Sequence, residues 1–151
     1  MSTKGWEFGS DGPSVLVVGI DGSDTSWRAM YYAFGLARRQ RSSVIAVFAV
    51  TTSVPVACDG TVIDMPEAGQ GLQEMAADLR TAVQGLAEEC RVSTRFVCAP
   101  GDPVLVLGGF AAEHGADAII IGASQAFTHR FFGSVAVRAI RRCQCPVTVV
   151  P

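Results

Sequence analysis

Lysine is almost absent from this sequence. Of its 12 basic residues 11 are arginine, and the one lysine, Lys4, precedes the first hydrophobic segment. A P-loop nucleotide site and a phospho-accepting response regulator each need a lysine on the folded core, so both classes are excluded. Any binding or chemistry must therefore use other side chains and the backbone.

Long hydrophobic runs and an excess of positive charge are also missing. Every apolar run in the 151 residues is interrupted well before the roughly 18 residues that a membrane span requires. The formal net charge of −2 excludes a generally basic nucleic-acid binder. We therefore expect neither a membrane nor a nucleic acid as partner.

Cysteine and histidine are too few and too scattered for a metal site. The odd number of cysteines argues against a disulfide framework, and no secretory signal is visible, so we expect a cytoplasmic protein. Cys143 and Cys145 form a close pair, but zinc needs more ligands, and His114 and His129 show no clustered spacing. We expect the pair to be small buried residues beside a strand, with a metal or redox role as the alternative. The five cysteines are Cys58, Cys90, Cys98, Cys143 and Cys145.

Buried strands alternate with amphipathic helices after a glycine-containing segment, 1–13, which we expect to be a flexible tail. Residues 14–151 are expected to form a single domain, since a chain of this length buries a sufficient core. β-branched apolar runs are typical of strands that are buried on both faces. Strands are predicted at 15–20, 44–50, 93–98, 118–121 and 147–150, and helices at 24–41, 72–86, 104–113 and 134–142. This alternation predicts an α/β fold with a parallel sheet.

The predicted sheet is doubly wound, with the strand order 3-2-1-4-5 that right-handed crossovers favour. Ligands bind such sheets where the winding reverses, here between the first and fourth strands. Asp21 follows the first strand and Gly122 ends the fourth, so both are expected in one crevice. The helix that starts after Gly133 would point its free N–H groups at the same crevice, which suits an anion.

Charge is unevenly distributed along the chain. Residues 118–151 contain four arginines and no acidic residue, so this segment carries +4 and the remainder carries −6. Arg138, Arg141 and Arg142 have a simple explanation, because cations near a helix C-terminus complement its dipole. Arg130, in the loop before Gly133, is the better candidate for contact with a phosphate.

Several short motifs, taken in order, resemble the universal stress protein family. They are VVGIDGS at 17–23, GDP at 101–103, AAEHGAD at 111–117, IIGAS at 120–124, GSVA at 133–136 and CPVTVV at 145–150. The resemblance covers roughly residues 14–151. It implies an adenine-nucleotide alpha-hydrolase-like fold, which is Rossmann-like. It also implies a non-enzymatic stress or dormancy regulator that responds to ATP or another adenine nucleotide, with Mg²⁺, and acts as a homodimer.

The resemblance further implies which residues contact the nucleotide. Asp21 would contact ribose or the bound metal, and the backbone of Ala49 would contact adenine. A plain turn is the alternative role for Asp21 and for Gly122, and a helix N-cap is the alternative for Ser134. The candidate set is Gly19, Ile20, Asp21, Ala49, Gly122, Ala123, Arg130, Gly133, Ser134 and Val135. We expect no catalytic residue, because no Ser-His-Asp or Cys-His constellation has a plausible placement; slow ATP hydrolysis is the alternative.

The phosphate loop departs from the pattern G-x2-G-x9-G-[ST] of the family's ATP-binding members. Gln125 replaces the second glycine, and the spacer 126–132 has 7 residues instead of nine. A side chain at 125 stands where backbone N–H groups would approach phosphate. The alternative function is therefore a ligand-free dimeric scaffold. In both cases Val147–Val150 would form an edge strand of the sheet. The resemblance implies that two copies of the protein pair through this strand.

Overall fold

Five parallel strands form one sheet in the order β3-β2-β1-β4-β5, as the sequence predicts. The computed structural model describes residues 14–51, 70–123 and 134–151. The central strand β1 pairs with β2 and β4, and in this register Val17 of β1 lies opposite Ile45 of β2 and Ile119 of β4. The strands are β1 (Val15–Gly19), β2 (Ser43–Val50), β3 (Thr94–Pro100), β4 (Ala118–Gly122) and β5 (Val147–Val150).

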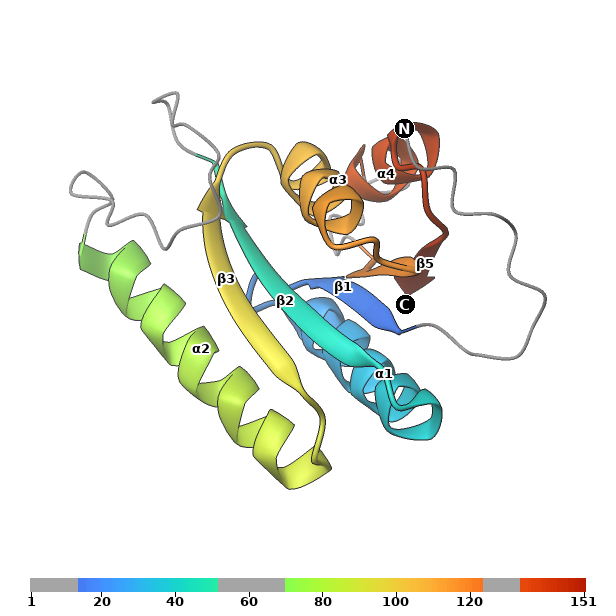
Figure 1. Cartoon of the computed structure of the whole chain (residues 1–151). Coiled ribbons are helices and arrows are strands. Elements are labelled where there is room, and N and C mark those ends of the chain that lie inside the picture. Colours follow the sequence, from blue (N-terminus) through green and yellow to red (C-terminus); the bar gives the residue numbers. More distant parts are fainter. Residues whose placement is uncertain (1–13, 52–69, 124–133) are drawn as a thin grey trace.

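Four helices cover the two faces of the sheet, two on each (Figure 1). They are α1 (Asp24–Gln40), α2 (Gln70–Cys90), α3 (Pro103–Glu113) and α4 (Ser134–Arg142). Helices α1 and α2 pack on one face, and α3 and α4 on the other. The predicted α/β doubly wound architecture is therefore confirmed. Helix α2 extends beyond its predicted stretch of 72–86 at both ends, and Ala87 and Cys90 of the added residues pack against the core.

The core consists of two apolar layers, one on each side of the sheet. In β1, Leu16 and Val18 face the layer of α1 and α2, while Val17 faces the layer of α3 and α4. All three are fully buried, which explains why this strand is continuously apolar rather than alternating. Neighbouring residues of one short strand thus hold both helical layers.

Sharp turns at the carboxyl ends of the strands lead directly into helices. Gly22, after β1, has φ +85° and Gly101, after β3, has φ +129°, a region that side chains strongly disfavour. Ser23 then caps α1, and Asp102 caps α3 with its carboxylate. Residues at the starts of α1, α3 and α4 line one pocket together with residues at the carboxyl ends of β1 and β4. Within the described part of the chain, no helix has both the length and the apolarity to cross a bilayer.

Candidate functional site

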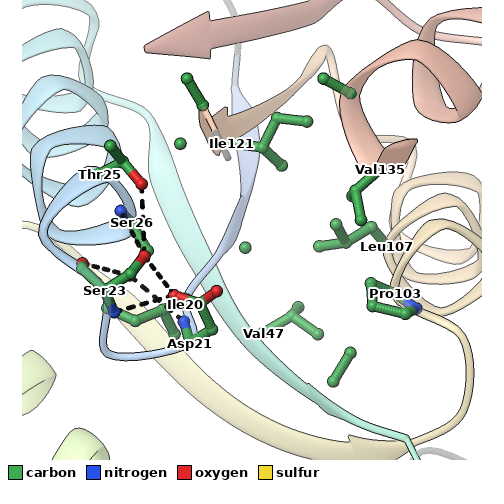
Figure 2. Close-up of a pocket in the computed structure, with 15 residues that line it drawn as sticks. Ile20, Asp21, Ser23, Thr25, Ser26, Val47, Pro103, Leu107, Ile121 and Val135 are labelled. Atoms are coloured by element: carbon green, nitrogen blue, oxygen red, sulfur yellow. Dashed lines mark hydrogen bonds between the residues drawn. The ribbon is translucent and has the colours of Figure 1, made fainter. Parts of the chain in front are cut away.

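A cavity of about 230 Å³ lies at the carboxyl ends of β1 and β4, where the sheet reverses its winding. Figure 2 shows two different walls. Side chains from the start of α1 form a polar wall, and side chains from α3 and α4 form an apolar one. The lining residues are Gly19, Ile20, Asp21, Ser23, Thr25, Ser26, Val47, Ala49, Pro103, Leu107, Ile121, Gly122, Ala123, Val135 and Ala136.

The structure brings together most of the candidate residues that the sequence suggested. Seven of the ten line this cavity: Gly19, Ile20, Asp21, Ala49, Gly122, Ala123 and Val135. Ser134 is the first residue of α4. Arg130 and Gly133 lie outside the described residues, as does Gln125. Residues of the cavity that the sequence analysis did not name as site residues are Ser23, Thr25, Ser26, Val47, Pro103, Leu107, Ile121 and Ala136.

Asp21 is held in place by the residues that start α1. Its Oδ1 accepts hydrogen bonds from the amide of Ser23 at 2.9 Å and from the Ser23 hydroxyl at 2.6 Å. Both of these hydrogen bonds end on Oδ1, and Asp21 lines the cavity. Burial is the largest influence on the pKa of Asp21 and raises it, but the hydrogen bonds from Ser23 and Ser26 together outweigh burial, and the pKa lies below its usual value. Asp21 is therefore a preorganised, ionised acceptor.

The same serine residues complete the polar wall. The Ser23 hydroxyl oxygen accepts the amide of Ser26 at 3.2 Å, which caps α1. The hydroxyl of Ser26 donates to the Ser23 carbonyl at 2.8 Å, and the amide of Asp21 donates to the Ser26 hydroxyl oxygen at 3.3 Å. Thr25 and Ser26 are almost fully buried, so their hydroxyls are fixed rather than free to rotate into solvent. The wall is rigid before any ligand arrives.

Gly122 is required by a close approach of two backbones. A Cβ built on this glycine would lie 2.7 Å from the amide nitrogen of Ser26 and 2.5 Å from the carbonyl oxygen of Thr25. Real Cβ atoms do not approach backbone so closely, so the end of β4 packs against the first turn of α1 only with glycine here. The sequence suggested a tight turn or a phosphate contact for Gly122; the observed packing against α1 is a third reason.

Ala49 lies where β2 continues past the end of its neighbour. β1 ends at Gly19, which pairs with Val47, and the Val47 carbonyl accepts the amide of Ile20 at 2.9 Å. Backbone groups of alternate residues point to the same side of a strand. The N–H and C=O of Ala49 therefore point toward the space beyond the end of β1, and no β1 residue lies opposite Ala49. Their position at the cavity gives the backbone one donor and one acceptor there.

The apolar wall depends on how α3 packs over the sheet. A Cβ on Gly19 would lie 3.3 Å from both Leu107 of α3 and Ile121 of β4, so glycine lets these side chains close over the strand. Pro103 and Val135 continue the wall at the starts of α3 and α4 (Figure 2). Such a surface suits a flat apolar group such as a base.

An ion pair connects the two helices of the apolar wall. Nη2 of Arg138 in α4 lies 2.8 Å from Oδ2 of Asp102. Partial burial raises the pKa of Asp102, but hydrogen bonds from Arg138 and from the amides of Leu105 and Val104 outweigh it, and the pKa lies below its usual value. Arg141 and Arg142 lie in the last turn of α4, as expected for cations that complement the dipole. Arg138 does not fit that expectation, because it reaches sideways to α3.

The paired cysteines lie away from this cavity. Cys143 and Cys145 are free thiols that pack against the layer of α3 and α4, but they are half-buried rather than fully buried as expected. Burial raises the pKa of both thiols, which keeps them protonated near neutral pH. Among the described residues, no group of three or more His, Cys, Asp or Glu side chains could hold a metal ion.

Comparisons with known proteins agree with one another. A model of the universal stress protein family matches residues 14–151. A universal stress protein of Methanocaldococcus jannaschii is 30% identical over 139 residues, which are 89% of this chain and 80% of that protein.

Solved structures show the same fold, the adenine-nucleotide alpha-hydrolase-like fold. A universal stress protein in complex with cAMP is 23% identical with a TM-score of 0.72, and the match covers 92% of this chain and 97% of that chain. A universal stress protein of Archaeoglobus fulgidus in complex with dAMP is 21% identical with a TM-score of 0.69, and here 91% of this chain and 98% of that chain are covered.

Proposed function

The chain belongs to the universal stress protein family, and from this premise we propose that it binds an adenine nucleotide in the cavity between β1 and β4. The observation that carries the proposal is the cavity itself, which joins an ionised acceptor, Asp21, to an apolar wall at the reversal of the sheet. The relatives in complex with cAMP and dAMP support the choice of an adenine nucleotide.

Each part of the cavity suits one part of the ligand. Adenine lies between Val47 and Leu107 and exchanges hydrogen bonds with the backbone of Ala49. The carboxylate of Asp21 accepts a ribose hydroxyl or contacts Mg²⁺, for which a carboxylate oxygen is an ordinary ligand. The amides of Val135 and Ala136, at the start of α4, suit the phosphate because the first turn of a helix leaves its N–H groups unpaired.

The bound nucleotide acts as a signal rather than as a substrate. Asp21 is the one titratable side chain among the described lining residues, and its lowered pKa makes it an acceptor rather than a general acid. His114, after the end of α3, stacks on Phe110 with ring centroids 6.1 Å apart and is not among the described residues that line the cavity. We therefore propose a non-enzymatic stress regulator. Phosphate release from ATP at a rate that falls in Asp21→Ala would contradict this.

Isothermal titration with ATP, ADP, AMP and cyclic AMP tests the binding. We expect at least one of them to bind with a Kd below 1 mM, since a Kd of 1 mM corresponds to only about 4 kcal/mol of binding free energy. Asp21→Ala is expected to weaken binding about tenfold or more, in line with the loss of a charged hydrogen bond. The matched control Asp78→Ala removes an exposed carboxylate from α2 and should bind like the wild type. No heat with any of the four at millimolar concentration would refute ligand binding.

A ligand-free scaffold is the second candidate, and the sequence observation that favours it is Gln125 in the phosphate loop. The cavity volume of about 230 Å³ also lies just below the range of roughly 300–1,000 Å³ of small-molecule sites. Native mass spectrometry of gently purified protein separates the two candidates. A co-purified nucleotide excludes the scaffold, whereas apo protein together with silent titrations favours it.

We also propose a cytoplasmic homodimer that associates through β5. This strand forms one edge of the sheet, and Val149 on it is 37% exposed. Free backbone groups on an edge strand favour pairing with a second copy. The free thiols of Cys90, Cys98, Cys143 and Cys145 fit a reducing compartment. Cell fractionation tests the location, and recovery of the protein outside the cytoplasm would overturn it.

A further inference from the structure

One carboxylate connects three elements behind the apolar wall of the cavity. Asp102 follows β3, and its Oδ1 accepts the amides of Val104 at 3.0 Å and Leu105 at 3.3 Å, which caps α3. Its Oδ2 accepts a hydrogen bond of 2.8 Å from Nη2 of Arg138 in α4. Both oxygens are thus in use, one for each helix. A movement of α4 away from α3 has to break the bond to Oδ2.

The ion pair lies next to the residues that line the cavity. Pro103 comes directly after Asp102, and Val135 and Ala136 lie three and two residues before Arg138. Figure 2 shows Pro103 and Val135 on the same wall. Asp102 and Arg138 themselves are not among the described lining residues. They connect the helices from outside the cavity, so a change in this pair acts on the cavity through α4.

Apolar packing alone holds α4 only weakly. The helix has 9 residues, too few to be stable in isolation. Its buried side chains in the described part are Ala136 and Ala139, which offer little apolar surface; Val135 is only partly buried against the same core, and Ile140 is 61% exposed. The direction and position of α4 therefore depend on the bond to Asp102 more than they would in a helix with large buried side chains.

We propose that the Asp102–Arg138 ion pair positions the first turn of α4 at the cavity and thereby sets the affinity for the phosphate of a bound nucleotide. The second half of this statement rests on the proposed function. Asp102 and Arg138 are positioning residues, because they act through the amides at the start of α4. Those amides bind an anion only at hydrogen-bonding distance, so a small displacement of α4 weakens contact with phosphate and leaves contact with the base intact.

Hydrogen exchange on the ligand-free protein tests the positioning without any nucleotide. Arg138→Gln removes the charge, Arg138→Lys keeps it, and Arg141→Gln is the matched control, since it removes an exposed arginine from the same helix. In Arg138→Gln we expect the amides of residues 138–143 to exchange about two to five times faster, the range for a partly exposed ion pair. Arg138→Lys should largely restore the wild-type rate. Unchanged exchange of these amides in Arg138→Gln would overturn the proposal.

Titration with adenosine and AMP then tests the consequence for the ligand. Arg138→Gln is expected to lower the ratio of AMP affinity to adenosine affinity by about two- to fivefold, whereas Arg141→Gln leaves it unchanged. Faster exchange with an unchanged ratio would overturn the link to phosphate. If wild-type protein binds neither compound, the proposed function and that link both fail, and the exchange rates alone decide whether the ion pair positions α4.

Discussion

Single residues at this cavity have roles that are distinct from those their motif suggests. Gly122 belongs to the glycine pattern by which the sequence resembles its family, yet its Cβ position is filled by the backbone of Thr25 and Ser26. Asp21 also follows a motif, and here the structure adds that Ser23 holds one of its oxygens. A motif therefore identifies a position, while the neighbours of that position decide why the residue type is needed.

Replacing Gly122 should destabilise the protein, because the backbone of α1 cannot move aside as easily as a flexible side chain. We expect Gly122→Ala to lower the free energy of unfolding by about 1–3 kcal/mol, the usual cost of overpacking. Urea denaturation followed by circular dichroism measures it. The matched control is Gly85→Ala in α2, where nothing lies within 4 Å of the added Cβ. This control should be neutral or slightly stabilising, and equal stability of both variants would contradict the packing argument.

At the scale of helices and strands, periodicity predicted most of what is observed. The continuous run 44–50 indicated a strand buried on both faces, and β2 has that burial. The helices predicted at 24–41 and 104–113 begin within one residue of α1 and α3, which are capped by Ser23 and Asp102. The contact between Arg138 and Asp102 was not predictable in this way, because a pattern along one helix does not reveal which neighbouring helix it meets.

The candidate site was predictable to a similar extent. Right-handed crossovers bring the ends of β1 and β4 together, so the position of Asp21 beside Gly122 follows from chain order alone. Leu107 was not predictable as part of the cavity, since its place depends on the rotation of α3 about its own axis. Leu107 packs over Gly19, and such a contact between residues far apart in the sequence does not appear in the pattern of one helix.

The cap of α3 should respond to pH. The pKa of Asp102 is lower in the folded protein than in the unfolded chain, so its stabilisation is present above about pH 4 and is lost as pH falls below that value. Asp102→Asn keeps an oxygen acceptor for the cap but loses the charge. We expect this variant to be less stable than wild type at pH 7, by about 1 kcal/mol or less for a partly exposed pair.

The difference between the two proteins should then shrink as pH falls below about 4, because the unfolded wild-type chain takes up a proton there before the folded carboxylate does. Urea midpoints at pH 7, 5, 4 and 3 measure the difference. Asp78→Asn, which changes an exposed carboxylate on α2, is the matched control. A difference between wild type and Asp102→Asn that is as large at pH 3 as at pH 7 would show that the charge of Asp102 does not stabilise the fold.

For the whole molecule, the exposed edge at β5 is the feature that bears on assembly. We expect a homodimer in solution, and Val149→Lys should convert it to a monomer, because lysine on an edge strand opposes pairing. Light scattering at high concentration distinguishes a particle of 15.9 kDa from one of twice that mass. Leu105→Lys replaces another exposed apolar residue, 59% exposed on α3, and should remain dimeric. A wild-type monomer would refute the dimer.

The contact between Gly122 and α1 makes the cavity stiff on one side only. The start of α1 packs against the end of β4 through backbone atoms, whereas α4 is held by two buried alanines, the partly buried Val135 and a partly exposed ion pair. We therefore expect a ligand that needs more room than about 230 Å³ to displace α4 rather than α1. Because α4 leads through Pro146 into β5, we expect such a displacement to reach the edge strand at which a second copy is proposed to pair.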